Sequence, residues 1–350
     1  MSYLRNAWYV AAWSTELEPG ELLARTLLDE PLVFYRDAAG HPRALADRCP
    51  HRFAPLSMGR LCDEGASVQC PYHGLRFDAS GTCVHNPHGD GHIPKAAQVR
   101  SYPMAERYSA LWIWMGDPSR ADPAAIPDFS FNDPEHWAVG CGSMVVDAPY
   151  ELEIDNILDL SHIEFMHPLF SSDAVRRAKV ECEQVDDTVW CRRFMADDRQ
   201  VPDFLRQAFQ VPEGALDRWL HVRWNAPASL ALWAGGVSAG RPPEQGIVSP
   251  SAHCFTPESR ERTRYFYSIS FPRAMGPMAE TLAAQNVEVL RSPFENEDKP
   301  IVEAVARRMG SNDLWALKPV LLAGDAAAVR ARRILRAQIE KEEAAASLER

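Results

Sequence analysis

Apolar residues in the first third of the chain gather in short runs that polar and turn-forming residues separate. Residues 22–28, 32–35 and 111–114 are runs of this kind, and each has the length of a β-strand. A turn-forming stretch at 37–40 follows the second run. The pattern predicts an all-β domain over residues 1–117.

The pattern changes after a Pro- and Asp-rich stretch at 118–134, which is the expected linker. Beyond it, strand-like runs occur together with long stretches of helical spacing. The expected strands lie at 145–153, 188–194, 219–224, 230–233 and 265–271. The expected helices lie at 154–167, 278–309 and 325–347. Strands combined with long helices predict an α+β domain around one sheet over residues 135–350.

Composition and charge narrow the function. The 350 residues carry a formal net charge of −11, which disfavours nucleic acid as a partner. Residues 1–20 lack the basic start and the apolar run of a signal peptide, and no apolar run is long enough to cross a membrane. We therefore expect a cytoplasmic protein whose cysteines outside any metal site are reduced.

Four potential metal ligands lie in two short stretches of the predicted β domain. Cys49 and His51 form a Cys-x-His pair, and eighteen residues later Cys70 and His73 form a Cys-x-x-His pair. Such spacing is typical of a metal site. A tetrahedral zinc ion would accept these ligands, and so would a two-iron, two-sulfide cluster with two cysteines on one iron and two histidines on the other. Mixed pairs of this kind are uncommon for zinc.

A second candidate site lies in the predicted helix at 154–167. Asp159 and His162 are three residues apart and share a helical face. His162 and His167 are five apart, about 140° around a regular helix, so an undistorted helix could not direct both to one ion. Pro168 disfavours the helical conformation for His167, and a π-bulge would also bring the imidazoles together. Spacing alone leaves two ordinary half-buried histidines as the alternative.

A mononuclear Fe(II) site needs a carboxylate beside two imidazoles. Asp298 lies within a predicted apolar stripe of the helix at 278–309. The stripe consists of Val287, Leu290, Phe294, Ile301 and Val305. A carboxylate in a buried stripe needs a metal or an ionic partner, and a neighbouring Lys or Arg is the alternative partner. Pro293 and Pro300 are expected to kink or break the helix, which would reset the stripe.

Together these features resemble the Rieske non-haem iron oxygenases, in the branch that holds the vanillate O-demethylase oxygenase components and dicamba monooxygenase. The resemblance rests on an early Arg-Asn-Ala-Trp-Tyr-Val, the two Cys/His loops, an Asp-Asn-x-x-Asp-x-x-His-x-x-x-x-His helix and a late Glu-Asp pair. It spans nearly the whole chain. It implies a Rieske [2Fe-2S] domain over 1–117, followed over 135–350 by a helix-grip-like α+β catalytic domain with an antiparallel sheet and a mononuclear iron.

The resemblance also assigns roles to the candidate residues. The implied cluster ligands are Cys49, His51, Cys70 and His73. The implied ligands of the catalytic iron are His162, His167 and Asp298. Asp159 would hydrogen-bond His162 and, across a subunit boundary, a cluster histidine of the neighbouring protomer in a homotrimer. Asn156 would support the iron site from nearby.

The implied function is that of a terminal oxygenase that O-demethylates a methoxylated aromatic acid or phenol with O2 and electrons from NADH, releasing formaldehyde. A separate flavin and iron–sulfur reductase, or a ferredoxin, would deliver the electrons, since the chain has no nucleotide-binding Gly-rich loop. The expected pocket residues are Leu160, Trp233, His253, Asn286 and Leu290. Hydroxylation of a ring methyl group, or demethylation of an amine, is the alternative on the same fold.

Two interpretations come from other classes of protein. The chain could be a stand-alone electron carrier, although a Rieske ferredoxin needs only about 100 residues. It could also be a zinc-binding interaction protein. The colour of the purified protein separates the zinc interpretation from a cluster-bearing oxygenase, because an iron–sulfur cluster is red-brown and a zinc site is colourless.

Overall fold

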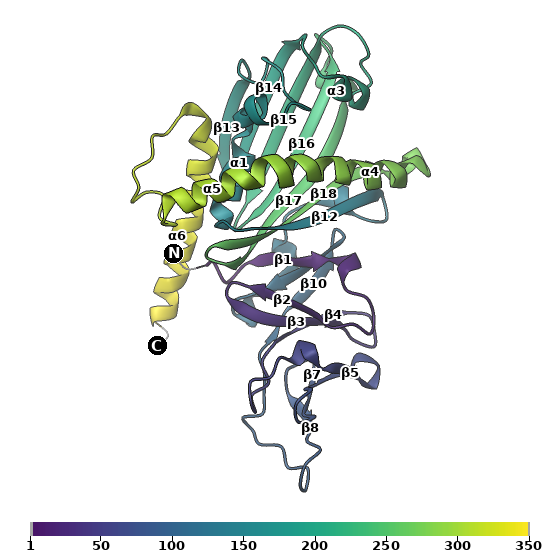
Figure 1. The fold of residues 1–350 in the computed structure, drawn as a ribbon, viewed down its shortest axis with the longest axis vertical. Coiled ribbons are helices and arrows are strands. Elements are labelled where there is room, and N and C mark those ends of the chain that lie inside the picture. Colours follow the sequence, from purple (N-terminus) through teal and green to yellow (C-terminus); the bar gives the residue numbers. More distant parts are fainter. Residues whose placement is uncertain (1–2, 349–350) are drawn as a thin grey trace. The chain divides into compact units, whose positions relative to one another are not determined.

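The computed structural model describes residues 3–348 and divides the chain into two compact units (Figure 1). The smaller unit holds Arg5–Ile126 together with Thr256–Arg260. The larger unit holds Pro127–Phe255 and the chain from Glu261 onward. Within residues 3–348, no helix has the length and apolarity that crossing a membrane requires.

The boundary between the units falls inside the stretch 118–134 that was expected to be a linker. The second half of this stretch is fixed to the larger unit. Ser130–Asn132 forms a 3₁₀ turn, and the side chain of Asn132 is buried. Asn132 Nδ2 donates to Ser268 Oγ (2.9 Å), and Asn132 Oδ1 accepts from Ser270 Oγ (2.7 Å). These bonds satisfy an amide that would be costly to bury alone.

The smaller unit consists of short antiparallel strands, as its apolar runs predict. Its strands are β1 (Trp8–Trp13), β2 (Leu23–Leu27), β3 (Glu30–Arg36), β4 (Pro42–Ala46), β5 (Arg60–Cys62), β6 (Ser67–Gln69), β7 (Arg76–Asp78), β8 (Cys83–His85), β9 (Ser101–Tyr102), β10 (Met104–Arg107) and β11 (Ala110–Trp114). They form sheets of order β1-β11-β10, β2-β3-β4-β9 and β5-β6-β7-β8. The described part of this unit contains no α-helix, so the all-β prediction is confirmed.

The larger unit is built on one antiparallel sheet of order β12-β18-β17-β16-β15-β14-β13. Its strands are β12 (Trp137–Val146), β13 (Lys179–Val185), β14 (Thr188–Asp198), β15 (Leu216–Asn225), β16 (Ser229–Ser238), β17 (Ile247–Ser259) and β18 (Arg262–Pro272). Its helices are α1 (Tyr150–Leu158), α2 (Ile163–Met166), α3 (Asp203–Ala208), α4 (Met278–Pro293), α5 (Lys299–Met309) and α6 (Ala326–Leu348). The predicted α+β class is confirmed.

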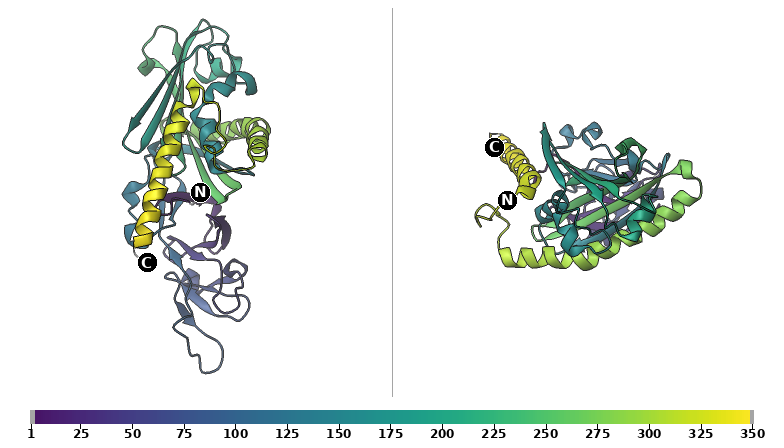
Figure 2. Two further views of the ribbon diagram at one scale, coloured as in Figure 1. Left: turned by 90° about the vertical axis from the view of Figure 1, so that its left-hand side faces the viewer. Right: turned by 90° about the horizontal axis from the view of Figure 1, so that it is seen from above.

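Helix α4 and its continuation α5 run along one side of this sheet (Figures 1 and 2). Gly140 on β12 lets the backbone of α4 come close, because a Cβ there would lie 2.2 Å from the carbonyl oxygen of Ala283. Helix α6 packs on β13, β14 and α1. Arg332 of α6 holds α1 through two donors to Asp155, with Nη2–Oδ2 at 2.6 Å and Nε–Oδ1 at 2.9 Å.

The strand expected at 145–153 is wrong in its second half. Strand β12 ends at Val146, and α1 begins at Tyr150. Pro149 immediately precedes the first helical residue with φ −60° and ψ 139°. Proline has no N–H to give to a sheet ladder, and its fixed φ suits the start of a helix. The proline therefore ends the strand and leads into α1.

The helix at 278–309 is not broken at Pro293 or Pro300, but a π turn distorts it directly after Pro293 and resets the stripe, as a kink or break was expected to do. A π-helical turn at Phe294–Asp298 joins α4 to α5, and Lys299 N–H donates to Phe294 O. A π turn holds one residue more than an α turn, which shifts the later positions by about 100° around the axis. The predicted stripe is accordingly wrong beyond Asp298. Val302 is buried (5% exposed), whereas the expected stripe residues Ile301 and Val305 are exposed.

Candidate functional site

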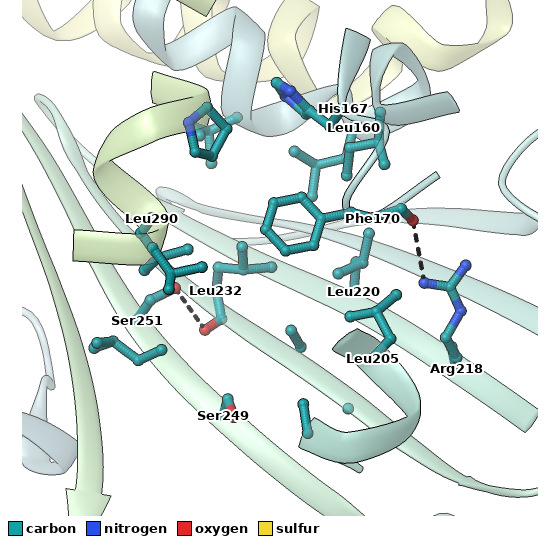
Figure 3. A pocket seen from close by; sticks show the side chains of 18 of the residues that line it. Leu160, His167, Phe170, Leu205, Arg218, Leu220, Leu232, Ser249, Ser251 and Leu290 are labelled. Carbon is teal, nitrogen blue, oxygen red and sulfur yellow. Dashed lines mark hydrogen bonds between the residues drawn. The ribbon is translucent and has the colours of Figure 1, made fainter. Parts of the chain in front are cut away.

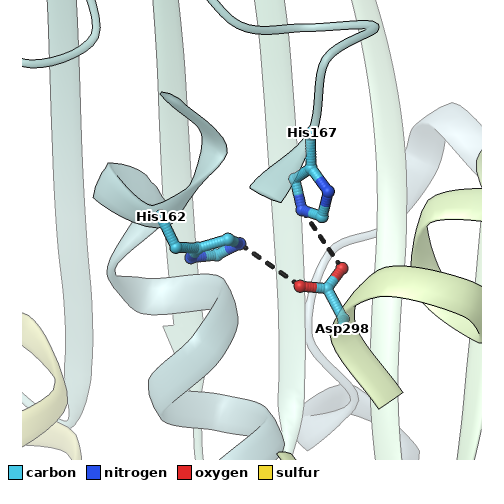
Figure 4. Close-up of side chains that lie close together, drawn as sticks. All are labelled: His162, His167 and Asp298. Atoms are coloured by element: carbon cyan, nitrogen blue, oxygen red, sulfur yellow. Dashed lines mark ion pairs between the residues drawn. The ribbon is translucent and has the colours of Figure 1, made fainter. Parts of the chain in front are cut away.

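Three side chains from separate segments converge in the larger unit. His162, His167 and Asp298 each offer one ligand atom, and these atoms lie within 4.8 Å of one another (Figure 4). His162 Nε2 lies 3.4 Å from Asp298 Oδ1, and His167 Nε2 lies 3.3 Å from Asp298 Oδ2. Among the described residues, no other group of three His, Cys, Asp or Glu side chains meets so closely. We call these three residues the triad.

The two histidines meet because the helix at 154–167 is broken twice. Helix α1 ends at Leu158, and Asp159 has non-helical angles (φ −117°, ψ 89°). The short helix α2 then ends at Met166, and His167 also leaves the helix (φ −115°, ψ 83°). The second break is the distortion that Pro168 predicts. The first break was not expected, and the π turn lies on the helix of Asp298 instead.

The helical turn that carries Asp298 explains how a carboxylate reaches the histidines. Asp298 is the last residue of the π turn and is 6% exposed. Its Oδ1 accepts a hydrogen bond from Asn156 Nδ2 (3.1 Å), so α1 holds the carboxylate in place. Within the described residues, Asp298 forms ion pairs with the two imidazoles, and not with the Lys or Arg of the alternative interpretation.

Hydrogen bonds outside the triad fix the tautomer of each imidazole. His162 Nδ1 lies 2.8 Å from the carbonyl oxygen of Asp159, and His167 Nδ1 lies 2.5 Å from Glu297 Oε2. Both partners are acceptors, so each Nδ1 carries the proton and each Nε2 keeps a lone pair directed into the triad. Two neutral imidazoles and a carboxylate are the protein ligands of non-haem Fe(II) sites. The triad therefore fits a divalent iron.

Burial and charge act in opposite directions on the two imidazoles. Burial lowers the pKa of His162 and outweighs the carboxylate of Asp298. Burial would also lower the pKa of His167, but the hydrogen bonds and charges of Asp298 and Glu297 prevail and raise it. A divalent ion binds the lone pair of a neutral imidazole, so at Nε2 it would compete with a proton.

The contact between Asp159 and His162 differs from the expected one. The backbone carbonyl of Asp159, and not its carboxylate, accepts the hydrogen bond from His162. The carboxylate Oδ1 instead accepts from Ser161 N–H (3.0 Å) and from Arg193 Nη2 (3.1 Å). The break at Asp159 turns the carbonyl toward the imidazole, which leaves the side chain to cap the following turn.

The two Cys/His loops of the smaller unit repeat one backbone design. Cys49 N–H donates to Ala54 O, and Cys70 N–H donates to Leu75 O. In return, Cys49 O accepts from Phe53 N–H, and Cys70 O accepts from Gly74 N–H. Phe53 and Gly74 both have positive φ, 61° and 76°, at the equivalent position. Each loop thus folds back after its cysteine and brings its histidine to the same place.

The loops separate thiols from imidazoles. Cys49 and Cys70 are 1% and 2% exposed within a core cluster of this unit, and burial raises the pKa of the Cys49 thiol to about 11. His51 lies at the surface, with its ring centroid 4.4 Å from that of His73. The four ligand atoms do not gather within 4.8 Å, as one tetrahedral zinc ion would require. A two-iron cluster with cysteines on one iron and histidines on the other fits this separation.

Comparison with known proteins identifies a family for each of the two units. Residues 7–103 match the Rieske [2Fe-2S] domain family, and residues 146–341 match the vanillate O-demethylase oxygenase C-terminal domain family. The oxygenase component of dicamba O-demethylase from Stenotrophomonas maltophilia is 40% identical over 348 residues, which cover 97% of this chain and 98% of that protein. The oxygenase component of chloroacetanilide N-alkylformylase from Rhizorhabdus wittichii is 36% identical, covering 97% of each chain.

A solved structure extends the agreement to the fold. Dicamba monooxygenase bound to 3,6-dichlorosalicylic acid has a TM-score of 0.90 and 37% identity, covering 98% of this chain and all of that one. A β domain with a Rieske-type ligand set, joined to an α+β domain with a His/His/Asp triad, defines a Rieske oxygenase. This chain belongs to the vanillate O-demethylase branch of the Rieske non-haem iron oxygenases. It is the oxygenase component of a multicomponent system and an oxidoreductase.

A cavity of about 160 Å³ lies beside the triad in the larger unit (Figure 3). Apolar side chains form most of its wall. Of the residues expected to line a pocket, Leu160, His253, Asn286 and Leu290 do so. Trp233 does not, and this expectation is corrected. Its neighbours Leu232 and Ala234 line the cavity, and since side chains alternate along a strand, Trp233 lies on the other face of the sheet against Trp190.

His253 is buried (1% exposed) at the cavity wall. Its Nε2 lies 2.9 Å from Ser251 Oγ, and its Nδ1 lies 2.6 Å from Tyr265 Oη. Burial lowers the pKa of His253 to about 3, so this imidazole is neutral at physiological pH. Both ring nitrogens of His253 therefore have partners within the protein, and the imidazole adds no positive charge to the cavity.

Several residues of the site were missed by sequence reasoning. Glu297 bonds His167, and Arg218 and Phe170 line the cavity. Glu297 could have been predicted from the sequence, since it adjoins Asp298 at the edge of the predicted stripe. Arg218 and Phe170 could not, because only the folded sheet brings them to the cavity.

Proposed function

We propose that this chain removes the methyl group from a methoxylated aromatic acid or phenol. One molecule of O2 and two electrons from NADH convert the aryl methyl ether into a phenol, formaldehyde and water. A separate reductase, or a ferredoxin, delivers the electrons. We also propose that the reaction takes place in the cytoplasm, where NADH is available.

The observation that carries the proposal is the single apolar cavity beside the triad. An apolar cavity of about 150 Å³ accommodates a benzene ring. The cavity of about 160 Å³ suits one substituted ring, and His162, His167 and Asp298 all lie on its wall. A ring held there presents a substituent to the triad. Relatives named for dicamba and vanillate O-demethylation share the fold and most of the chain length.

The metal centres are assigned to the residues that fit them. We assign a mononuclear Fe(II) to His162, His167 and Asp298, in agreement with a dicamba monooxygenase structure that contains non-haem iron. We assign a Rieske [2Fe-2S] cluster to the two loops of the smaller unit. Its ligands are Cys49, His51, Cys70 and His73. When bound, the centres supply one-electron transfer and the activation of dioxygen.

The remaining residues of the site orient the triad side chains and exclude water from the cavity. Asn156 holds the carboxylate of Asp298, while Asp159 and Glu297 hold the two imidazoles through their Nδ1 atoms. The apolar cavity wall keeps bulk water from the reacting methyl group. We further propose a homotrimer in which the carboxylate of Asp159 contacts a cluster histidine of the neighbouring protomer.

The test is turnover of the holoenzyme with a reductase and NADH on a panel of methoxybenzoates and methoxyphenols. Equal amounts of formaldehyde and demethylated phenol are expected. The same panel includes a ring-methyl compound and an N-methyl aniline, which test the alternative reactions. Products from these two and none from the ethers would overturn O-demethylation. A parallel measurement of molar mass in solution tests the trimer.

A further inference from the structure

The cavity beside the triad has one positively charged side chain on its wall, and that charge is already balanced. Among the residues that line the cavity, Arg218 is the one Lys or Arg (Figure 3). It is 5% exposed, and its partner Asp198 is 0% exposed. Arg218 Nε and Nη2 lie 2.8 and 2.6 Å from Asp198 Oδ2. A buried carboxylate at this distance neutralises the guanidinium before any ligand enters.

Two further donors of Arg218 are directed at the protein, which leaves one N–H of Nη1. Arg218 Nη2 donates to Ser172 Oγ (2.8 Å), and Nη1 points to the carbonyl oxygen of Phe170 at 3.4 Å. All three guanidinium nitrogens thus face protein oxygens. The strongest recognition of a carboxylate by arginine needs two parallel N–H donors, and this arrangement does not leave such a pair.

The other polar groups on the wall add no positive charge. His253 is neutral, and Asn286 donates through Nδ2 to the helix carbonyl of Leu282 (2.9 Å). A divalent ion at the triad would be balanced by two carboxylates, Asp298 within the triad and Glu297 on His167. A ligand carboxylate would therefore lose its hydration shell and meet no compensating charge.

We propose that the cavity selects uncharged aryl methyl ethers and rejects analogues that carry a carboxylate. The inference rests on the proposed function for the identity of the reaction, and it narrows the substrate class to phenols and other neutral rings. The hydroxyls of Ser249 and Ser251 and the amide of Asn286 lie on the cavity wall, where they can hydrogen-bond a neutral polar substituent.

The test compares a matched pair of ligands of nearly equal shape. Calorimetric titration of the anaerobic, reductase-free holoenzyme measures binding of 4-methoxybenzamide and 4-methoxybenzoate, and then of the 3-methoxy pair. The amide of at least one pair is expected to bind about 100-fold more tightly than its acid, because only the acid buries an unpaired charge. Acids that bind as tightly as the amides, or amides that do not bind, would overturn the inference.

Two variants extend the test. Leu220 lies on the cavity wall, so Leu220→Lys introduces a cation without a partner, with Leu220→Met as its uncharged control. Lysine is expected to reverse the preference toward the acid, and methionine to leave it unchanged. Asp198→Asn frees Arg218 and is expected to shift the preference in the same direction. A preference that stays the same in both folded variants would contradict the inference.

Turnover separates this inference from the proposed function. Neutral ethers that bind tightly but release no formaldehyde with reductase and NADH would overturn O-demethylation and leave the charge selectivity standing. Formaldehyde released equally well from acids and neutral ethers, with equal affinities, would retain O-demethylation and overturn the selectivity.

Discussion

The two metal sites of this protein differ in how they are encoded. The cluster loops place four ligands within 25 residues, from Cys49 to His73, and each loop is shaped by its own backbone bonds. The triad takes two ligands from a broken helix and the third from a π turn more than 130 residues later. A site made by local loops can be recognised from spacing, whereas an assembled site depends on every element that positions it.

The most severe test of this comparison removes a cluster ligand. Cys70→Ser is expected to abolish the red-brown colour and all turnover, because electrons can no longer reach the catalytic domain. Iron at the triad is expected to persist at about one per chain, measured after chelation of loosely bound metal. The control Cys62→Ser keeps a hydroxyl near Gln69 Oε1, which Cys62 Sγ contacts at 3.2 Å, and should retain colour and turnover. Simultaneous loss of triad iron would show that the sites are not independent.

The reciprocal test removes a triad ligand. His162→Ala is expected to abolish formaldehyde release through loss of one iron per chain, while the visible spectrum of the cluster remains. The exposed His136 provides the control, since His136→Ala removes an imidazole away from both sites. A bleached cluster in His162→Ala would mean that this histidine belongs to the other centre.

Deletion of one residue tests the π turn. Removing the exposed Asn296 would leave an α turn between α4 and α5. Asp298 would then be rotated by about 100° relative to α4, away from the histidines. Iron retention at the triad should fall sharply, with the cluster spectrum unchanged. Asn296→Ala keeps the chain length and should retain iron. A deletion variant that holds iron as well as Asn296→Ala would refute this role of the π turn.

A smaller loss of iron affinity is expected when the metal ligand His167 is kept and only its hydrogen-bond partner is changed. Glu297→Gln replaces the carboxylate that accepts from His167 Nδ1 with an amide of similar shape. Loss of such a support typically lowers metal affinity by about 10- to 100-fold. Titration with Fe(II) under anaerobic conditions measures the change. The neighbouring Glu295 forms an ion pair with Arg291, so Glu295→Gln is the matched control and should bind iron normally.

The smallest expected effect is on the pH dependence of the free energy of unfolding. The pKa of His253 is lowered by burial to about 3, below that of an unfolded chain, about 6.5. Below pH 6.5 the unfolded state therefore binds a proton that the folded state does not, and stability falls as the pH falls. From pH 7 to pH 5 this histidine should cost about 2 kcal/mol. Urea unfolding of His253→Asn should show a decline smaller by that amount, and an equal decline would contradict the buried neutral state.

The sequence predicted the elements whose signals are local. The cluster loops, the distortion at His167 before Pro168, and the burial of Asp298 were all predicted from short stretches. The break at Asp159 was not, because nothing in its neighbours excludes a helix there. The π turn was not predicted either, since one inserted residue leaves no mark in composition.

The residues of the cavity wall were likewise only partly predicted from the sequence. Leu160, His253, Asn286 and Leu290 were placed on its wall correctly. Trp233 was placed wrongly because neighbouring strand residues face opposite ways, and sequence alone did not fix which face is which. Arg218 was overlooked because its position depends on the pairing of β15 with β16.

The strand side of the cavity wall and the triad belong to different layers of the larger unit. Leu220, Leu232 and Ser249 project from adjacent strands β15, β16 and β17 (Figure 3). The three ligands come from helices and their termini (Figure 4). Exchanges on the strand layer can therefore re-tune which molecules are accepted while the iron-holding layer keeps its geometry. Directed evolution of new specificity should find its productive mutations at alternate strand positions.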